Sequence, residues 1–115
     1  MNILHTIPSL GVNSGGPPVS TTLAVKGLRA QGVDAEILTH EASSGGENII
    51  EKEYTHFLPP PLERKFGYSK DFRNYLEKNR KYDLYHCQGV WQYPTYITAK
   101  KARKFGKPYV ITPRG

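Results

Sequence analysis

The sequence has 115 residues, of which 37% are hydrophobic and 23% are charged, and its net charge is +6 at pH 7. This composition is typical of one globular domain with a modest core, and it excludes a largely disordered chain. Because no apolar run is longer than four residues, we also expect no transmembrane helix.

The first part of the chain predicts a strand, a glycine-rich loop, a helix and a second strand. Residues 2–7 are rich in Ile and Leu and follow no basic segment, which indicates a strand and not a signal peptide. Pro17 and Pro18 suit the first turn of a helix, where a missing N–H costs nothing. Apolar residues then recur at helical spacing up to Gly32, a typical helix stop, and residues 33–39 predict the second strand.

The remainder predicts three more strands and two more helices. Residues 54–58 indicate a third strand, which ends at a run of three prolines. Ser69 is a good N-cap for the next helix, and residues 83–87 predict the fourth strand. Pro94 begins a further helix, after which residues 108–112 form the expected fifth strand.

This alternation of strands and helices predicts an α/β fold, a Rossmann-like parallel sheet with flanking helices and right-handed crossovers. Ligands of such sheets bind at the carboxyl ends of the strands. The loops at residues 9–16, 88–93 and 113–115 should therefore lie on one edge. The order of the strands within the sheet is not readable from the sequence.

Charge is distributed unevenly along the chain. Residues 1–62 carry a net charge of −3 and residues 63–115 a net charge of +9. A basic half suits an anionic partner such as a nucleotide diphosphate, a nucleic acid or a membrane surface, although residues 100–107 also fit a solvated helix face. Cys87 is the only cysteine, so no internal disulfide forms and a cytoplasmic location is expected.

The loop that contains Gly15 and Gly16 is the first candidate binding segment. Its glycines permit close approach of the backbone to a ligand, and the following helix directs free N–H groups at the loop, which suits an anion. The spacing does not match a dinucleotide fingerprint. Pro17 and Pro18 stand where a nucleoside triphosphatase loop has Lys and Ser or Thr, so that site is excluded. An ordinary strand-to-helix turn remains the alternative.

The second and third candidate segments follow the fourth and fifth strands. His86 and Gln88 share one face of the strand, and they could bind sugar hydroxyls or simply the local backbone. Trp91, with the tyrosines at positions 93 and 96, could form a platform for a sugar ring or cap the hydrophobic edge of the sheet. Arg114 offers a bidentate donor for phosphate or carboxylate, or lies on the surface of a turn.

The sequence lacks the motifs of metal-dependent sugar transferases, of other metal sites and of serine hydrolases. It has no Asp-x-Asp motif of the kind that holds a diphosphate through a divalent ion, and its four histidines and one cysteine have no metal-ligand spacing. No serine lies in a nucleophile elbow. We therefore expect no metal and no resident cofactor.

Taken in order, three stretches carry a resemblance to a known family. They are the strand and loop from Ile3 to Pro17 with Gly15-Gly16-Pro17, the segment from Asp83 to Pro94 with His86-Cys87-Gln88-Gly89-Val90-Trp91, and the segment from Lys107 to Gly115. Together they resemble the N-terminal, acceptor-side domain of the family 4 (group 1) glycosyltransferases, which have the two-domain GT-B fold.

The resemblance implies a retaining, metal-independent transfer of a sugar, such as a hexose, from a nucleotide-diphosphate donor to a glycan or lipid-linked acceptor, as in polysaccharide biosynthesis. It places Gly15 and Gly16 near the donor diphosphate, and Trp91 and Arg114 on the acceptor side. The family often has a second histidine two residues after the position of His86. Here Gln88 stands there, so the resemblance gives the active-site position to Gln88, with His86 as the other candidate.

The resemblance also implies that residues 1–115 are part of a longer first domain and that a second, donor-binding domain completes the enzyme. We expect the chain alone to be inactive, to self-associate through uncovered sheet surface, and to contact the inner face of a membrane peripherally. One alternative is a non-catalytic Rossmann-like module that binds an anion or nucleotide. A nucleic-acid-binding fragment is the weakest reading, because no motif accompanies the charge.

Overall fold

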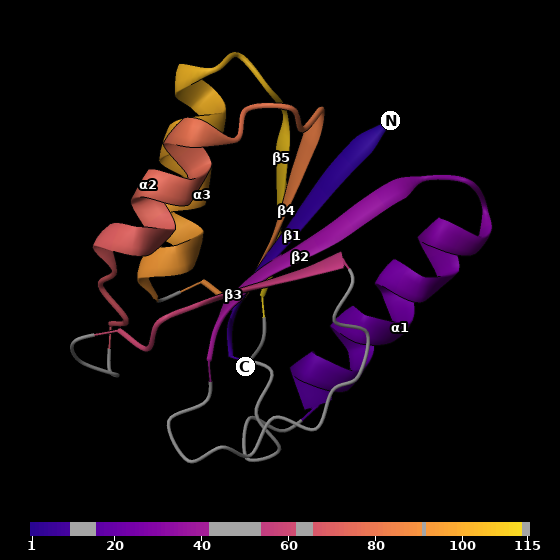
Figure 1. The fold of residues 1–115 in the computed structure, drawn as a ribbon, viewed down its shortest axis with the longest axis horizontal. Helices are drawn as coiled ribbons and strands as arrows, with labels where there is room; N and C mark the ends of the chain where they lie inside the picture. Colours follow the sequence, from indigo (N-terminus) through magenta and orange to yellow (C-terminus); the bar gives the residue numbers. More distant parts are fainter. Residues whose placement is uncertain (10–15, 42–53, 62–65, 91, 114–115) are drawn as a thin grey trace.

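The computed structural model describes residues 1–9, 16–41, 54–61, 66–90 and 92–113. Five parallel strands form one sheet with the spatial order β3-β2-β1-β4-β5 (Figure 1). The strands are β1 (Asn2–Ser9), β2 (Asp34–His40), β3 (Thr55–Leu58), β4 (Leu84–Gln88) and β5 (Tyr109–Thr112). The predicted Rossmann-like α/β class is thus confirmed, and every predicted strand forms within two residues of its expected limits.

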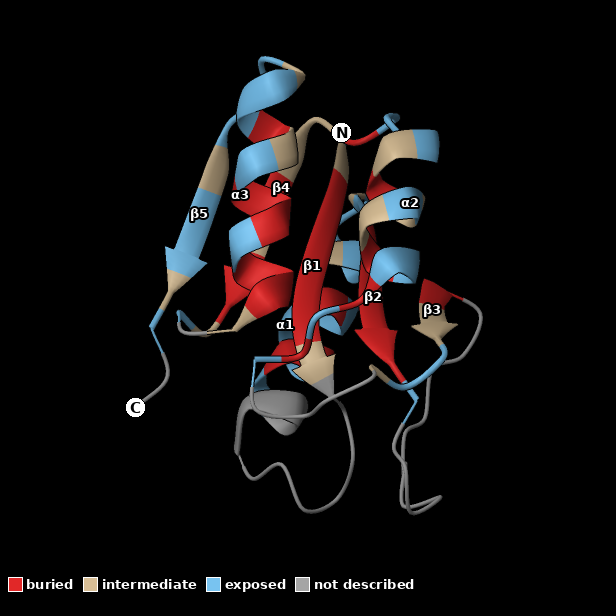
Figure 2. Ribbon diagram, turned by 90° about the vertical axis from the view of Figure 1, so that its left-hand side faces the viewer, coloured by how far each residue is buried: buried red, intermediate tan, exposed pale blue. Residues whose placement is uncertain are grey.

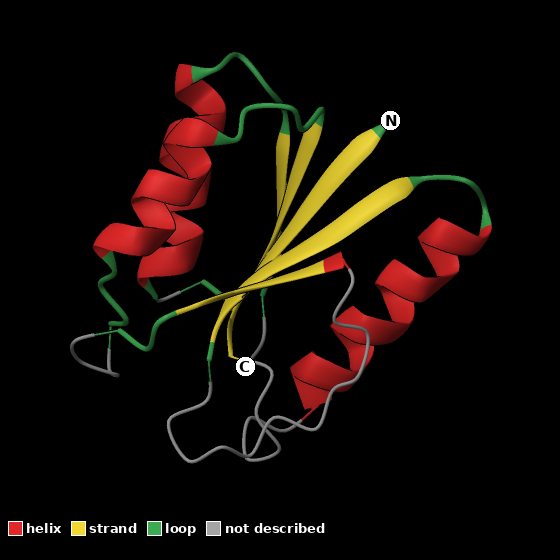
Figure 3. Cartoon of the chain, viewed as in Figure 1, coloured by secondary structure: helices red, strands yellow, loops and turns green. Residues whose placement is uncertain are grey.

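The described residues between the strands include three helices, α1 (Gly16–Ala30), α2 (Lys70–Lys78) and α3 (Tyr93–Lys104) (Figure 3). Their ends follow the local signals. The Ser69 hydroxyl accepts a hydrogen bond from the Phe72 N–H at 3.1 Å, which satisfies one of the free donors at the start of α2. Pro94 lies in the first turn of α3, and Gly106 follows that helix with a φ of 70°, a conformation that favours glycine.

The helices lie in two layers, with α1 on one face of the sheet and α2 and α3 on the other (Figure 1). The layer of α2 and α3 covers a core that includes Leu4, Leu38 and Tyr85, and α1 covers a smaller core around Ile7 and Ile37. Because side chains alternate along a strand, each buried strand supplies both cores. This gives β1 and β2 their almost continuous burial (Figure 2).

The strand β5 forms one edge of the sheet and is the most exposed of the strands (Figure 2). Val110 is 48% exposed and Ile111 is 38% exposed, although both are large apolar side chains. Val110 lies on the same face of the sheet as α1, which packs over β1 and β2. Among the described helices, none covers that face over β4 and β5. No helix in the described parts of the chain is long and apolar enough to cross a membrane.

Candidate functional site at the carboxyl edge of the sheet

The end of β4 and the loop that follows it are held on both sides. Gln88 lies opposite Thr112 in the β4–β5 register, and the Gly89 N–H donates to the Thr112 carbonyl at 2.9 Å. On the other side, the Thr95 hydroxyl of α3 donates to the Gly89 carbonyl at 2.7 Å. Gly89 has a φ of 98°, a backbone conformation that other residues rarely adopt. The chain therefore leaves the sheet at Gln88 in one fixed direction.

His86 lies one pleat before Gln88 on the same face of the sheet, as the strand periodicity predicts. Its Nε2 atom lies 2.5 Å from the Thr112 hydroxyl, and its ring lies 4.9 Å from the ring of His5 on β1. His5 is buried, and its Nδ1 atom has no hydrogen-bond partner in the described part of the chain. Burial, together with the neighbouring imidazole of His86, lowers the pKa of His5 to about 4.

Gln88 itself is only 4% exposed, and neighbouring groups of the protein interact with it. Packing around this nearly buried side chain restricts the orientations of its amide. Such an amide can donate and accept hydrogen bonds but cannot exchange a proton near neutral pH. The two polar side chains that the sequence singled out on β4 thus lie on one face of the strand. Gln88 is the last residue of β4, and His86 lies two residues before it.

Of the other four predicted site residues, the structure describes only Gly16. Gly16 is the first residue of α1, and that helix begins on the same side of the molecule as the carboxyl ends of the strands (Figure 1). Gly15, Trp91 and Arg114 lie outside the described residues. The geometry therefore supports a common edge for the first and second candidate segments, and the roles of these three residues stay predictions.

A comparison with protein families completes this picture. A family model described as a glycosyl transferase 4-like domain matches residues 15–115. The chain belongs to this family. No curated protein and no solved structure gives a significant match. The resemblance that the sequence suggested is therefore confirmed at the level of the family, together with the predicted fold class.

The structure separates the two tyrosines that the sequence grouped with Trp91 in this glycosyltransferase domain, since one is buried and the other is exposed. Tyr93 is 5% exposed and belongs to the core, so it fits the alternative of capping the sheet and does not present a platform. Tyr96 is 51% exposed. Phe66 and Tyr68, which the sequence analysis did not single out, both lie against Tyr93. Only a contact prediction across some 25 residues would have found them, because no local pattern marks them.

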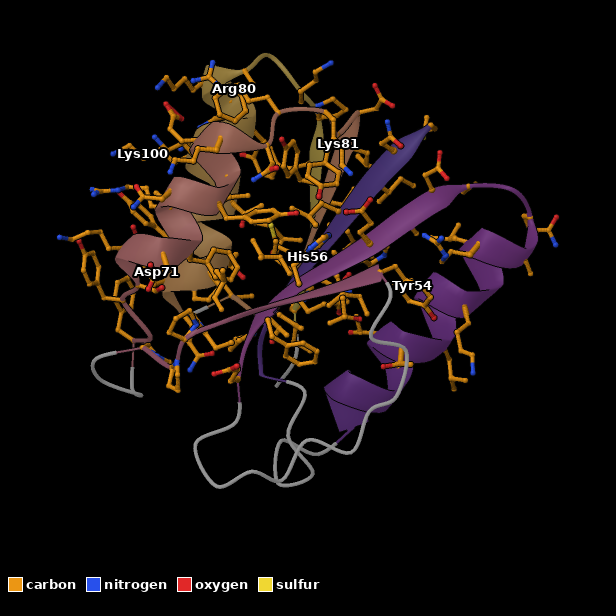
Figure 4. The ribbon with its side chains drawn as sticks, viewed as in Figure 1. Tyr54, His56, Asp71, Arg80, Lys81 and Lys100 are labelled. Atoms are coloured by element: carbon orange, nitrogen blue, oxygen red, sulfur yellow. The ribbon has the colours of Figure 1, made fainter. Side chains whose placement is uncertain are left out.

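A second polar cluster of the domain surrounds Glu36 on β2. Its carboxylate accepts hydrogen bonds from Lys81 at 2.9 Å, from the Tyr82 hydroxyl at 2.7 Å and from His56 at 2.7 Å. Figure 4 labels two of these partners, His56 and Lys81. Burial alone would raise the pKa of Glu36, but these hydrogen bonds outweigh it and hold the pKa below its ordinary value. Because the carboxylate is fully engaged and lies near the amino end of β2, away from the carboxyl ends of the strands, we assign this cluster a structural role.

The single thiol of the domain is not a nucleophile in this fold. Cys87 is fully buried, and burial raises the pKa of its thiol to about 11. Thiolate is the reactive form, so Cys87 stays protonated and inert near neutral pH. No group of three His, Cys, Asp or Glu side chains within the described ranges could hold a metal ion.

Proposed function

We propose that this chain is the acceptor-side domain of a retaining glycosyltransferase that moves a sugar from a nucleotide-diphosphate donor to a glycan or lipid-linked acceptor without a metal ion. The observation that carries the proposal is the position of Gln88, a nearly buried amide at the carboxyl end of β4, in a chain of the glycosyl transferase 4-like domain family. Ligands of parallel α/β sheets bind at this edge.

In this proposal Gln88 orients the transferred sugar or the leaving oxygen through hydrogen bonds. His86, one pleat earlier on β4, positions the end of that strand. Gly15 and Gly16 let the backbone approach the donor diphosphate at the start of α1, where the helix dipole favours negative charge. Trp91 and Arg114 contact the acceptor. A second domain supplies the rest of the donor site and stabilises the charge that develops on the leaving diphosphate.

Location and assembly belong to the same proposal. A cytoplasmic enzyme that uses nucleotide sugars fits the single buried cysteine and the basic second half of the chain. Peripheral contact with the inner face of a membrane is supported only by that positive charge, which would attract anionic lipids.

The proposal is tested by an assay of sugar transfer with a panel of UDP-, GDP-, ADP- and dTDP-sugars. We expect turnover from a protein that joins this domain to a donor-binding domain, and none from the 115-residue chain, since half of the cleft is then missing. Gly16→Val in the active protein should reduce kcat/KM for the donor by about tenfold or more, because a side chain obstructs backbone approach to the diphosphate.

The matched control is Gly27→Val, since Gly27 lies in the same helix and has open space around its α-carbon. Melting temperatures of both variants separate a folding defect from a binding defect. Unchanged donor kinetics in Gly16→Val with a normal melting temperature would show that the glycine loop is only a turn. Transfer to no acceptor from any donor in the panel would contradict the proposed function itself.

The exposed edge strand carries a prediction about association. β5 presents unpaired backbone groups and the exposed side chains of Val110 and Ile111, a combination that favours pairing with a second chain. In sedimentation velocity, the 115-residue chain should form dimers or larger species as its concentration rises, and Val110→Lys should reduce this association. A stable monomer at high concentration would count against it.

A further inference from the structure

Three exposed aromatic rings gather around the buried ring of Tyr93. The ring centroids of Tyr68, Phe66 and Tyr96 lie 4.9, 5.6 and 6.1 Å from that of Tyr93. Phe66 is 44% exposed, Tyr68 is 38% exposed and Tyr96 is 51% exposed. We refer to Phe66, Tyr68 and Tyr96 as the aromatic surface. Large apolar side chains left this open to water commonly mark a binding site when they are clustered.

The aromatic surface is held in place by the backbone. The Tyr93 N–H at the start of α3 donates to the Phe66 carbonyl at 2.6 Å, so the segment before α2 is joined to the first turn of α3. Ser69 caps α2 only one residue after Tyr68. Rings fixed in this way lose little conformational freedom when a ligand binds them.

The aromatic surface lies towards the edge of the sheet that carries Gln88. Phe66 and Tyr68 belong to the connection that leaves the carboxyl end of β3, and Tyr96 lies in the first turn of the helix that follows β4. Both connections begin at strand ends, where ligands of parallel sheets bind. The β4–β5 register assigns the Gln88 side chain to the α1 side of the sheet, and the rings lie on the side of α2 and α3. A chain molecule bound at the end of β4 could therefore pass over this end of the sheet and extend across the rings.

Two cations flank the rings. The Lys100 Nζ atom lies 5.7 Å from the centroid of the Tyr96 ring, and Lys100 projects from the outer side of the helix layer (Figure 4). Arg73 lies one turn into α2 after Tyr68, because its N–H donates to the Ser69 carbonyl at 3.3 Å. Its positive charge also opposes the rise in the pKa of Tyr93 that burial causes. Among the described residues no carboxylate pairs with Lys100 or Arg73, whereas Lys101 and Lys104 are both paired with Glu77.

We propose that the aromatic surface binds a carbohydrate chain that carries acidic groups, as an extended subsite for the acceptor. The apolar faces of sugar rings pack on the three aromatic rings, and carboxylates or phosphates of the chain pair with Lys100 and Arg73. This inference rests on the proposed function, because it treats the bound carbohydrate as the molecule that receives the sugar.

The composition of the surrounding surface favours a carbohydrate over a lipid bilayer. Helices that lie in a bilayer interface insert a broad apolar face. Here the apolar faces of α2 and α3 are packed on the sheet, and no aliphatic side chain is exposed on either helix. The exposed residues of the two helices are Lys70, Asp71, Asn74, Lys78, Tyr96, Lys100, Arg103 and Lys104.

The test is a titration of the 115-residue chain, with ¹³C-labelled aromatic rings, followed by NMR. The probes are tetragalacturonate, neutral maltotetraose, and vesicles of phosphatidylglycerol. Tetragalacturonate should shift the resonances of Phe66, Tyr68 and Tyr96. Tyr96→Ala should weaken its binding by about tenfold, the effect of losing one aromatic contact. Lys100→Gln should weaken binding by about threefold and reduce its dependence on salt.

Leu23→Ala is the control, since Leu23 is 63% exposed on α1, on the other face of the sheet, and its loss should leave binding unchanged. If Tyr96→Ala does not fold, Phe66→Ala replaces it. Equal binding of maltotetraose, or binding of the vesicles and not of tetragalacturonate, would overturn the inference. This titration contains no sugar nucleotide, so its result does not depend on catalysis. A failure in the separate assay of sugar transfer would contradict the proposed function and would leave the binding result unchanged.

Discussion

Lowering the pH from 7 to 4 is expected to reduce the free energy of unfolding by about 3 kcal/mol through His5 alone. Burial holds the pKa of His5 near 4 in the folded chain, against an ordinary value of 6.5. Between these two values the unfolded chain binds a proton at this residue and the folded chain does not. Stability is therefore highest above pH 6.5 and falls as the pH decreases towards 4.

Urea unfolding at pH 7, 6, 5 and 4 measures this loss, and His5→Leu is the informative variant. Leucine does not titrate, so the variant should lose much less stability over the same range, whatever its stability at pH 7. A smaller slope should remain, because burial also lowers the pKa of His40, and hydrogen bonds keep the pKa of Glu36 low. Parallel pH profiles for the two proteins would show that His5 does not control acid stability.

Gln88→Ala is expected to lower kcat/KM for sugar transfer by about ten- to a hundredfold in the enzyme that contains this domain. That is the scale of losing one or two good hydrogen bonds in the transition state. Since an amide does not titrate near neutral pH, the pH profile of kcat/KM should keep its shape. Steady-state kinetics between pH 5 and 9 measure both quantities.

The matched control is Gln31→Ala, which removes the same amide from the exposed turn between α1 and β2, at the opposite edge of the sheet. It should leave kcat/KM unchanged. Full activity in Gln88→Ala would remove Gln88 from the site. If His86→Ala keeps the fold but loses an essential ionisation from the pH profile, the chemical role belongs to His86 instead.

The elements of this fold were predictable because their signals are local. Ser69 caps α2, Pro94 lies in the first turn of α3, and short apolar-rich runs mark the strands. The strand order was not predictable. It depends on which buried faces fit together over long separations, as in the pairing of Ile3 with Leu84, and no short segment encodes that choice.

The candidate site was predictable to the same extent. The period of a strand places His86 and Gln88 on one face, which the structure confirms. The burial of Tyr93 and the exposure of Tyr96 depend on how α3 rotates against the sheet and on the segment before α2. Phe66 becomes part of the aromatic surface through its ring contact and its backbone hydrogen bond with Tyr93, which are interactions between segments that are distant in sequence.

The central place of β1 has a consequence for how the chain folds during synthesis. One side of β1 pairs with β2, which follows it closely in the chain. The other side pairs with β4, which is synthesised much later, since Ile3 lies opposite Leu84. At typical ribosome speeds the intervening residues take about 4 to 16 seconds to appear. During that interval the nascent strand keeps unpaired backbone groups and apolar side chains exposed, so a holding chaperone should associate with emerging chains until β4 has been made.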